Sequence, residues 1–300
     1  MTDVSGKVAV ITGAGSGLGR ALAYELGRRG VKLAVSDVDS TGLAETVKQL
    51  RVIGAPVHDA RLDVTDRAGV LSYADDVVSH YGTVNVVVNN AGIAFTGDIA
   101  DMTFDQLEQI MDADFWSVVN GTKAFLPHVI ASGDGHLVNI SSVFGLFSVA
   151  GMGAYNAAKF AVRGFTEALR QEMLLAGHPV QVTCVHPGGM KTAIVGNAGT
   201  VEGHDRENLI HFFDTRLAKT SADAAARQIL RGVARNRPKV LIGLDAILLD
   251  KLVRVLGSSY QRLAVRAVGR NLPSRVGAQT GSRPSGGPPV DEKGRARVTA

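Results

Sequence analysis

Short, almost wholly apolar runs alternate with helical patterns as far as residue 244, and this alternation constrains the fold more than any other feature. The run VNVVV at residues 84–88 is too apolar to be exposed on either face, as is typical of a strand inside a parallel sheet. Strands that alternate with helices form a parallel sheet covered on both faces. We therefore predict an α/β fold with a doubly wound, mostly parallel sheet of about seven strands. The expected strands are 7–12, 31–36, 57–63, 84–88, 136–140, 180–185 and 239–242.

Apolar residues at helical spacing predict the connecting helices at 18–29, 41–52, 65–81, 104–130 (one long helix), after Gly151, and at 222–234. No linker interrupts the alternation, so we expect residues 1–270 to form a single domain that ends in a helical extension over 245–270. Residues 271–300 hold four of the nine prolines and five glycines but few large apolar residues. Such a segment cannot bury enough surface to offset its ordering entropy, which predicts a disordered basic tail.

Composition and charge exclude several classes of protein. The single cysteine, Cys184, rules out an internal disulfide, and no histidine has metal-ligand spacing, so no metal is expected. No secretory signal is visible, and no uncharged apolar run reaches the about 18 residues of a membrane span, which favours a cytoplasmic location. Residues 266–300 hold seven basic and two acidic residues, leaving 25 basic against 26 acidic elsewhere. A nearly neutral body argues against nucleic acid as the partner.

A glycine-rich sequence, TGAGSGLG at residues 12–19, joins the first predicted strand to the first predicted helix. Glycine there lets the backbone turn sharply and approach a pyrophosphate, which then sits at the helix N-terminus. Tight turns between strands and helices need glycine in any case, but this strand–loop–helix context favours a dinucleotide site. The expected contacts are Gly13, Ser16, Gly17, Leu18 and Gly19.

Asp37 ends the second predicted strand, 18 residues after Gly19. A carboxylate there can accept hydrogen bonds from the adenosine ribose hydroxyls and would repel a 2′-phosphate. No Arg or Lys lies within residues 14–18 or directly after Asp37 to offset that repulsion. We therefore expect NAD rather than NADP; the alternative is a solvent-exposed turn aspartate.

Five motifs in order resemble the short-chain dehydrogenase/reductase family over residues 5–195. They are the TGxxxGxG loop at 12–19, Asp63-Val64, Asn89-Asn90-Ala91-Gly92, Ser142 thirteen residues before the YxxxK pair Tyr155 and Lys159, and Pro187-Gly188 with Thr192. The resemblance implies a Rossmann-fold catalytic domain that acts on CH–OH groups with a nicotinamide cofactor. It also implies that Asp63 and Val64 contact the adenine, that Asn90, Ala91 and Gly92 line the cofactor, and that Pro187, Gly188 and Thr192 contact the nicotinamide.

Tyr155 and Lys159 are four residues apart, so on a helix they share one face and point into one cleft. A phenol with a pKa of about 10 is a poor base at neutral pH, and a nearby ammonium favours its phenolate form. The resemblance implies that Tyr155 transfers a proton to or from the substrate oxygen, and that Lys159 lowers the tyrosine pKa and holds the nicotinamide ribose. It further implies that Ser142 hydrogen-bonds the substrate oxygen, while the cofactor carries the hydride.

One position departs from the family pattern. The family has an asparagine that supports a proton-relay water near the lysine, and the matching residue is Asp114. Asn120, six residues later, lies on a different helical face and is a poor substitute. An ionised aspartate cannot donate hydrogen bonds, so Asp114 either pairs with Lys159 and alters the relay, or only caps or solvates the helix. A catalytically impaired cofactor-binding scaffold or sensor therefore stays open as the alternative function.

Apolar residues in the expected substrate loops, 144–152 and 189–213, favour an apolar secondary alcohol or carbonyl compound. These loops supply Phe144, Leu146, Phe147, Met152, Met190, Ile194, Phe212 and Phe213, and the C-terminal helix is expected to add contacts. The resemblance implies a homodimer or homotetramer built through the two long helices around Ser142. The basic, amphipathic segment 245–270 leaves peripheral membrane contact open, beside packing against the body or a subunit.

Overall fold

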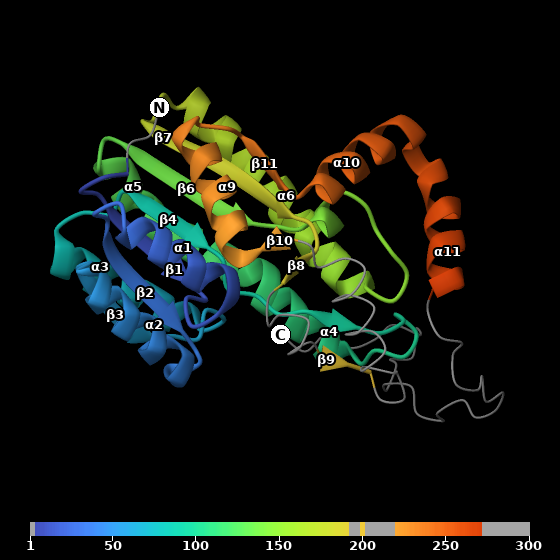
Figure 1. Ribbon diagram of the computed structural model, residues 1–300, viewed down its shortest axis with the longest axis horizontal. Helices are drawn as coiled ribbons and strands as arrows, with labels where there is room; N and C mark the ends of the chain where they lie inside the picture. The colour runs from blue at the N-terminus through green and yellow to red at the C-terminus, as the bar shows by residue number, and fades with distance from the viewer. Residues whose placement is uncertain (1–3, 192–198, 202–219, 272–300) are drawn as a thin grey trace, which may run out of the picture.

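A seven-stranded, wholly parallel sheet forms the centre of the computed structural model, which describes residues 4–191, 199–201 and 220–271 (Figure 1). The strand order is β11-β7-β6-β4-β1-β2-β3, and the predicted α/β class is confirmed. The strands are β1 (Val8–Thr12), β2 (Lys32–Asp37), β3 (Val57–Arg61), β4 (Val86–Asn89), β6 (Gly135–Ile140), β7 (Val180–Pro187) and β11 (Lys239–Ile242).

The order of the strands reverses beside β1. The chain runs outward from β1 through β2 to β3, then returns to place β4 on the other side of β1. In parallel sheets, ligands bind in the crevice outside the carboxyl ends of the strands at such a switch point. The glycine-rich loop after β1 and the Asn90-Ala91-Gly92 segment after β4 therefore meet at one crevice.

Helices cover both faces of the sheet because alternate residues of each strand point to opposite sides. In β1, Ala9 and Ile11 pack in one core with residues of α1 and α9, whereas Val8 and Val10 pack in the other with residues of α3 and α5. The helices are α1 (Gly17–Gly27), α2 (Ser40–Ile53) and α9 (Ala222–Ala234) for the first core, and α3 (Arg67–Tyr81), α5 (Ser117–Ala131) and α6 (Gly153–Leu175) for the second.

The prediction of a single long helix over 104–130 is wrong in one respect. The structure divides it into α4 (Phe104–Met111), a π-helical turn (Asp112–Trp116) and α5. Apolar periodicity cannot reveal one wider turn inside a helix, so this break could not be predicted from the sequence pattern. Single π-helical turns occur frequently at functional sites, and this one contains Asp114.

The predicted C-terminal extension consists of α10 (Leu244–Leu256), a 3₁₀ turn (Gly257–Ser259) and α11 (Tyr260–Asn271), which project from one end of the body (Figure 1). Ala246, Leu249 and Val253 pack with the segment that follows β6. Four two-residue strands were not predicted: β5 (Phe95–Thr96) pairs with β9 (Gly199–Thr200), and β8 (Met190–Lys191) with β10 (Thr220–Ser221). Apart from residue 271, the predicted basic tail lies outside the described residues.

Candidate active site

Two loops meet at the switch point of the sheet and hold each other in place. The Thr12 hydroxyl accepts hydrogen bonds from the backbone N–H groups of Asn90 and Ala91, both at 3.1 Å, and the Asn90 amide donates to the Thr12 carbonyl at 2.9 Å. Gly13 has φ +67°, and a Cβ on Gly19 would lie 2.1 Å from the Gly13 carbonyl oxygen. Both positions therefore require glycine.

Helix α1 begins at the end of this loop, with Ser16 as its N-cap residue and Gly17 and Leu18 in its first turn. The Ser16 side chain does not cap the helix, and no acidic residue lies in the first turn. The first N–H groups of a helix lack intrahelical partners and favour an anion. This helix start is therefore shaped to receive a pyrophosphate.

Asp37, at the end of β2, lies against the glycine-rich loop. One carboxylate oxygen accepts a hydrogen bond from the Gly15 N–H at 2.7 Å, and the other accepts one from the Asp39 N–H at 2.9 Å. Asp37 is thus fixed by its neighbours beside the loop that is expected to hold the pyrophosphate. A freely solvated turn aspartate does not describe this position.

Arg20 is a basic residue near this end of the crevice. It was not predicted from the sequence, because it lies just after the glycine-rich loop and not within residues 14–18 or after Asp37. Its guanidinium donates to the carbonyls of Gly15 and Gly42, and its Nε donates to the Thr46 hydroxyl at 2.9 Å. The Arg20 N–H groups are thus used in hydrogen bonds within the protein.

Asp63 and Val64 follow β3. An Asp63 carboxylate oxygen accepts hydrogen bonds from the N–H and hydroxyl of Thr65, at 2.9 and 2.7 Å. The buried Asn120 amide donates to the Val64 carbonyl at 3.1 Å. Asn120 therefore supports the expected adenine-binding segment.

Ser142, Tyr155 and Lys159 come together at the carboxyl end of the sheet, as predicted. Tyr155 and Lys159 lie on one face of α6, and the Lys159 ammonium is 5.5 Å from the centroid of the tyrosine ring. Ser142, which follows β6, lies close enough to Tyr155 to lower its pKa as a hydrogen-bonding partner. All three side chains are buried, so charges interact more strongly here than in water.

Burial raises the pKa of Tyr155 above its ordinary value. The Lys159 ammonium and the Ser142 hydrogen bond act in the opposite direction, and the Asp114 charge adds to the increase. The net direction is upward, so the phenol keeps its proton at neutral pH. In this form it can donate a proton to a carbonyl oxygen.

Asp114 is fully buried and forms an ion pair with Lys159, 3.4 Å between Oδ1 and Nζ. The same oxygen accepts a hydrogen bond from the Ile93 N–H at 2.8 Å, and Oδ2 has no partner among the described residues. Burial raises the pKa of Asp114, against the opposing effect of Lys159. The alternative that Asp114 only caps or solvates the helix is wrong, because the π-helical turn directs its carboxylate inward to the lysine.

Lys159 keeps its charge in this environment. Burial alone would lower the pKa of its ammonium, but the Asp114 carboxylate, together with Tyr155 when that phenol is ionised, outweighs that effect and the net shift is upward. The ammonium also donates to the Ile140 carbonyl at 3.5 Å. Its position is therefore fixed between the π-helical turn, the end of β6 and Tyr155.

The structure adds supporting residues that no local pattern indicated. The buried His186 ring lies 2.9 Å from the Ser142 carbonyl, and since a carbonyl only accepts, Nδ1 carries the proton. Burial lowers the pKa of His186 to about 4, so the ring is neutral. The Ser141 hydroxyl donates to the Lys159 carbonyl at 2.8 Å. These bonds hold the backbone at Ser142 and at Lys159 in place.

The segment expected to contact the nicotinamide begins with Pro187 and Gly188 at the end of β7. The Gly189 N–H donates to the Asp245 carboxylate at 2.8 Å, which ties this segment to the start of α10. Thr192, predicted as a cofactor contact, lies outside the described residues, as do the predicted substrate contacts Ile194, Phe212 and Phe213.

A row of four aromatic rings runs from Tyr155 to Tyr260 in the C-terminal extension. Phe144 meets the Tyr155 ring edge-on at 6.3 Å between centroids, Phe147 meets Phe144 at 5.5 Å, and Tyr260 meets Phe147 at 6.2 Å. The Tyr260 hydroxyl accepts a hydrogen bond from the Ser148 N–H at 3.0 Å. Leu146 and Phe147, predicted to contact substrate, are buried in the core beneath α10, whereas Phe144 stays half-exposed beside Tyr155.

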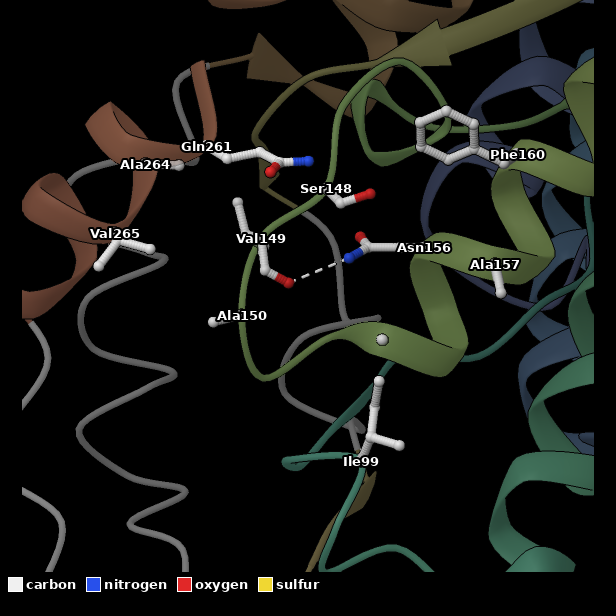
Figure 2. A pocket seen from close by; sticks show the side chains of 11 residues that line it. Ile99, Ser148, Val149, Ala150, Asn156, Ala157, Phe160, Gln261, Ala264 and Val265 are labelled. Atoms are coloured by element: carbon white, nitrogen blue, oxygen red, sulfur yellow. Dashed lines mark hydrogen bonds between the residues drawn. The ribbon is translucent and has the colours of Figure 1, made fainter. Parts of the chain in front are cut away.

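A pocket of about 500 Å³ lies between α6 and α11, next to residues 148–150 (Figure 2). The Asn156 amide, which donates to the Val149 carbonyl at 3.0 Å, crosses its wall. Ser142, Tyr155 and Lys159 do not line it. The lining is mostly apolar: Ile99, Ser148, Val149, Ala150, Gly153, Asn156, Ala157, Phe160, Gln261, Ala264 and Val265.

The fold, the glycine-rich loop and the buried Ser–Tyr–Lys cluster together define one class of enzyme. The family model described as short chain dehydrogenase matches residues 7–202. The chain therefore belongs to the short-chain dehydrogenase/reductase family and is an oxidoreductase of that type.

Individual relatives cover most of the chain. SadH of Mycobacterium tuberculosis (strain ATCC 25618 / H37Rv), named as an oxidoreductase, is 59% identical over 273 residues, which are 91% of this chain and 99% of the relative. Estradiol 17-beta-dehydrogenase 11 of Homo sapiens is 30% identical over 280 residues, covering 92% of this chain and 87% of the relative. A solved structure of a short chain dehydrogenase/reductase from Burkholderia phymatum in complex with NAD has a TM-score of 0.79 and 31% identity, covering 87% of this chain and 97% of that one.

Proposed function

We propose that this chain transfers a hydride between NAD(H) and an apolar secondary alcohol or ketone, with Tyr155 as the proton donor and acceptor. The observation that carries the proposal is the buried cluster of Ser142, Tyr155 and Lys159 at the carboxyl end of the sheet, beside the glycine-rich loop. A screen of secondary alcohols with NAD and of ketones with NADH, followed by NADH absorbance, tests it directly.

The roles of the three side chains follow from their contacts. Bound NAD supplies the hydride acceptor for alcohol oxidation. Ser142 orients the substrate oxygen by a hydrogen bond, and the Tyr155 hydroxyl exchanges a proton with that oxygen. The Lys159 ammonium favours the phenolate that forms when Tyr155 gives up its proton, and it holds the ribose next to the nicotinamide. The Asn90-Ala91-Gly92 segment lines the crevice on the side of β4.

NAD is the proposed cofactor because Asp37 presents acceptors, not donors, beside the loop for the pyrophosphate. The Burkholderia phymatum relative was solved with NAD, which supports the same choice. Arg20 is the nearby cation that could accommodate a 2′-phosphate, but its N–H groups donate to Gly15, Gly42 and Thr46.

Replacing Asp37 tests this preference. The parent should have a higher kcat/KM with NAD than with NADP. Asp37→Ala should lower the ratio of the two kcat/KM values by about tenfold or more, because repulsion of the 2′-phosphate is lost. Asp59→Ala on the neighbouring strand is the control and should leave the ratio unchanged. If the parent used NADP as well as NAD, the interpretation of Asp37 would be wrong, and Arg20→Gln would show whether Arg20 binds the phosphate.

An apolar substrate is proposed because Phe144 stands beside Tyr155, with further apolar side chains on the adjoining segment. The name of the human relative, estradiol 17-beta-dehydrogenase 11, refers to a steroid alcohol. A secondary alcohol on an apolar skeleton fits both observations, and a charged sugar phosphate fits neither.

Tyr260 is proposed as a positioning residue for the substrate wall. Tyr260→Phe keeps the ring contact with Phe147 but removes the acceptor for the Ser148 N–H. We expect KM for the alcohol to rise about threefold to tenfold, since a net hydrogen bond of about 1 kcal/mol holds the segment, with kcat and the Kd of NADH unchanged. A parallel loss of kcat and NADH affinity would show a general structural role instead.

A cofactor-binding scaffold or sensor without turnover is the second candidate, favoured by Asp114 at the position of the relay asparagine. It predicts tight NADH binding without oxidation of any alcohol in the screen. The buried Ser142, Tyr155 and Lys159 cluster supports the enzyme over the scaffold.

We further propose that the protein works in the cytoplasm as a homodimer or homotetramer. Among the described residues, no helix has the length and apolar character to cross a membrane, and the one cysteine, Cys184, is buried with its thiol free. Trp116, just before α5, and Phe160, on α6, are both exposed. These two helices are the ones expected at the subunit contact. Light scattering during size-exclusion chromatography measures the assembly.

A further inference from the structure

Helix α10 carries an apolar stripe on the side that faces away from the body. Leu244, Leu248 and Val255 are 79%, 66% and 84% exposed. Their spacing, with Lys251 between them, places all four residues on one side of the helix. The opposite side holds Ala246, Leu249 and Val253, which pack beneath the segment after β6. The outer stripe therefore takes no part in packing α10 against the body.

Helix α11 also exposes apolar and basic side chains. Leu263 is exposed, and so are the basic residues Arg262 and Arg266 beside it; Val265 is also exposed but lines the pocket between α6 and α11. In Figure 1, α10 and α11 extend from one end of the body. Seven large apolar side chains are exposed over these two short helices, with Ile247 and Leu252 of α10 included. Exposed apolar groups concentrated in this way mark an interaction site.

The acidic residues of this extension are all bonded, whereas most of its basic residues are exposed. Asp245 and Asp250 are its two acidic residues, and both make bonds to the body: Asp245 accepts from the Gly189 N–H at 2.8 Å, and Asp250 pairs with Lys239 at 2.7 Å. Arg254 pairs with Asp250 at 3.2 Å, whereas Lys251, Arg262 and Arg266 are exposed basic residues. The outer surface of the extension is thus apolar and basic, with its acidic groups turned inward.

We propose that the outer surface of α10 and α11 docks on an anionic phospholipid surface. Apolar side chains flanked by Lys and Arg are what a helix needs to lie in the interface of a negatively charged bilayer. The proposal goes beyond the reaction and does not depend on it. It would bring the substrate wall beside Phe144 close to a source of apolar alcohols, because Tyr260 joins that wall to α11.

Two other occupants fit less well. Residues 272–300 contain few large apolar side chains and carry five basic against two acidic residues, so they match neither the apolar stripe nor its charge. A second copy of the chain would bring one basic surface against another in a symmetric contact, with repulsion between like charges.

Co-sedimentation of the full chain with lipid vesicles tests the proposal. We expect binding to vesicles of phosphatidylglycerol and phosphatidylcholine, weaker binding to phosphatidylcholine alone, and a decrease as salt is raised. Leu248→Asp with Val255→Asp should weaken the partition into anionic vesicles by about tenfold or more. Leu174→Asp with Leu175→Asp is the matched control, since these leucines are 63% and 88% exposed at the end of α6, and it should bind as the parent does.

Circular dichroism and NADH binding establish that each variant is folded. Failure of the folded parent to bind anionic vesicles overturns the proposal, and so does equal weakening by the control pair. If the α10 pair instead converts an oligomer to a smaller species without lipid present, a second copy covers this surface and the lipid proposal is wrong. Binding that is lost only in the α10 pair supports it.

Discussion

Tyr155→Phe should reduce kcat by about 10²–10⁴-fold, the range in which a positioned proton donor contributes, while NADH binds as in the parent. The substitution keeps the ring that meets Phe144 edge-on and removes only the hydroxyl. Ser142 and Lys159 stay in place, but neither can take the proton in the same way. Lys159 is held as an ammonium by Asp114, and the nearby His186 ring bonds to the Ser142 carbonyl and not to its hydroxyl.

The measurement is single-turnover oxidation of one alcohol with saturating NAD, together with the Kd of NADH by fluorescence. Tyr81→Phe is the control, because the Tyr81 hydroxyl donates to the Leu33 carbonyl outside the crevice, at 3.0 Å. Residual activity within tenfold of the parent would mean that another group transfers the proton. Loss of NADH binding would show that Tyr155 serves the structure of the site, and the mechanism would be wrong.

The sheet and the catalytic cluster were predictable because both depend on local patterns. A buried parallel strand such as β4 needs an unbroken apolar run, and a helix that presents Tyr155 and Lys159 together needs only a spacing of four. The glycine-rich loop was equally readable, since steric conflict at Gly19 leaves no other residue type. In each case the physical requirement falls on consecutive residues of one element.

What the sequence did not reveal are contacts between distant elements. Arg20 reaches Gly42, His186 supports Ser142, and Tyr260 supports Ser148, and each pair is joined only by the packing of separate segments. The π-helical turn is the clearest example. Its residues read as ordinary helix, yet the wider turn directs Asp114 to Lys159. The departure from the family pattern was visible, but its physical consequence required the fold.

Asp114→Asn should move the pH profile of alcohol oxidation toward acid by about one pH unit. The Asp114 charge raises the pKa of Tyr155 and of Lys159. Oxidation needs Tyr155 without its proton, so activity rises with pH through the tyrosine pKa. When the charge is removed, that pKa falls, and the rising limb moves to lower pH. The rate at neutral pH should then equal or exceed that of the parent.

The lysine gives the same experiment a second readout. Without the carboxylate 3.4 Å away, the pKa of Lys159 also falls, so any alkaline decline should begin at lower pH. Asparagine is the chosen replacement because it keeps a polar group next to the ammonium. Removing one charge of a buried ion pair costs about 3–5 kcal/mol, and truncation to alanine would add the cost of a cavity.

Asp112→Asn is the matched control, because Asp112 lies in the same π-helical turn but is exposed. It removes an equal charge, which water screens, and should leave the profile unchanged. A shift in both variants would reflect the total charge of the turn and not the pair. Superimposed profiles for the parent and Asp114→Asn would mean that Asp114 carries no charge while the enzyme works. In that case Lys159 alone, without a paired carboxylate, would set the pKa of the catalytic tyrosine.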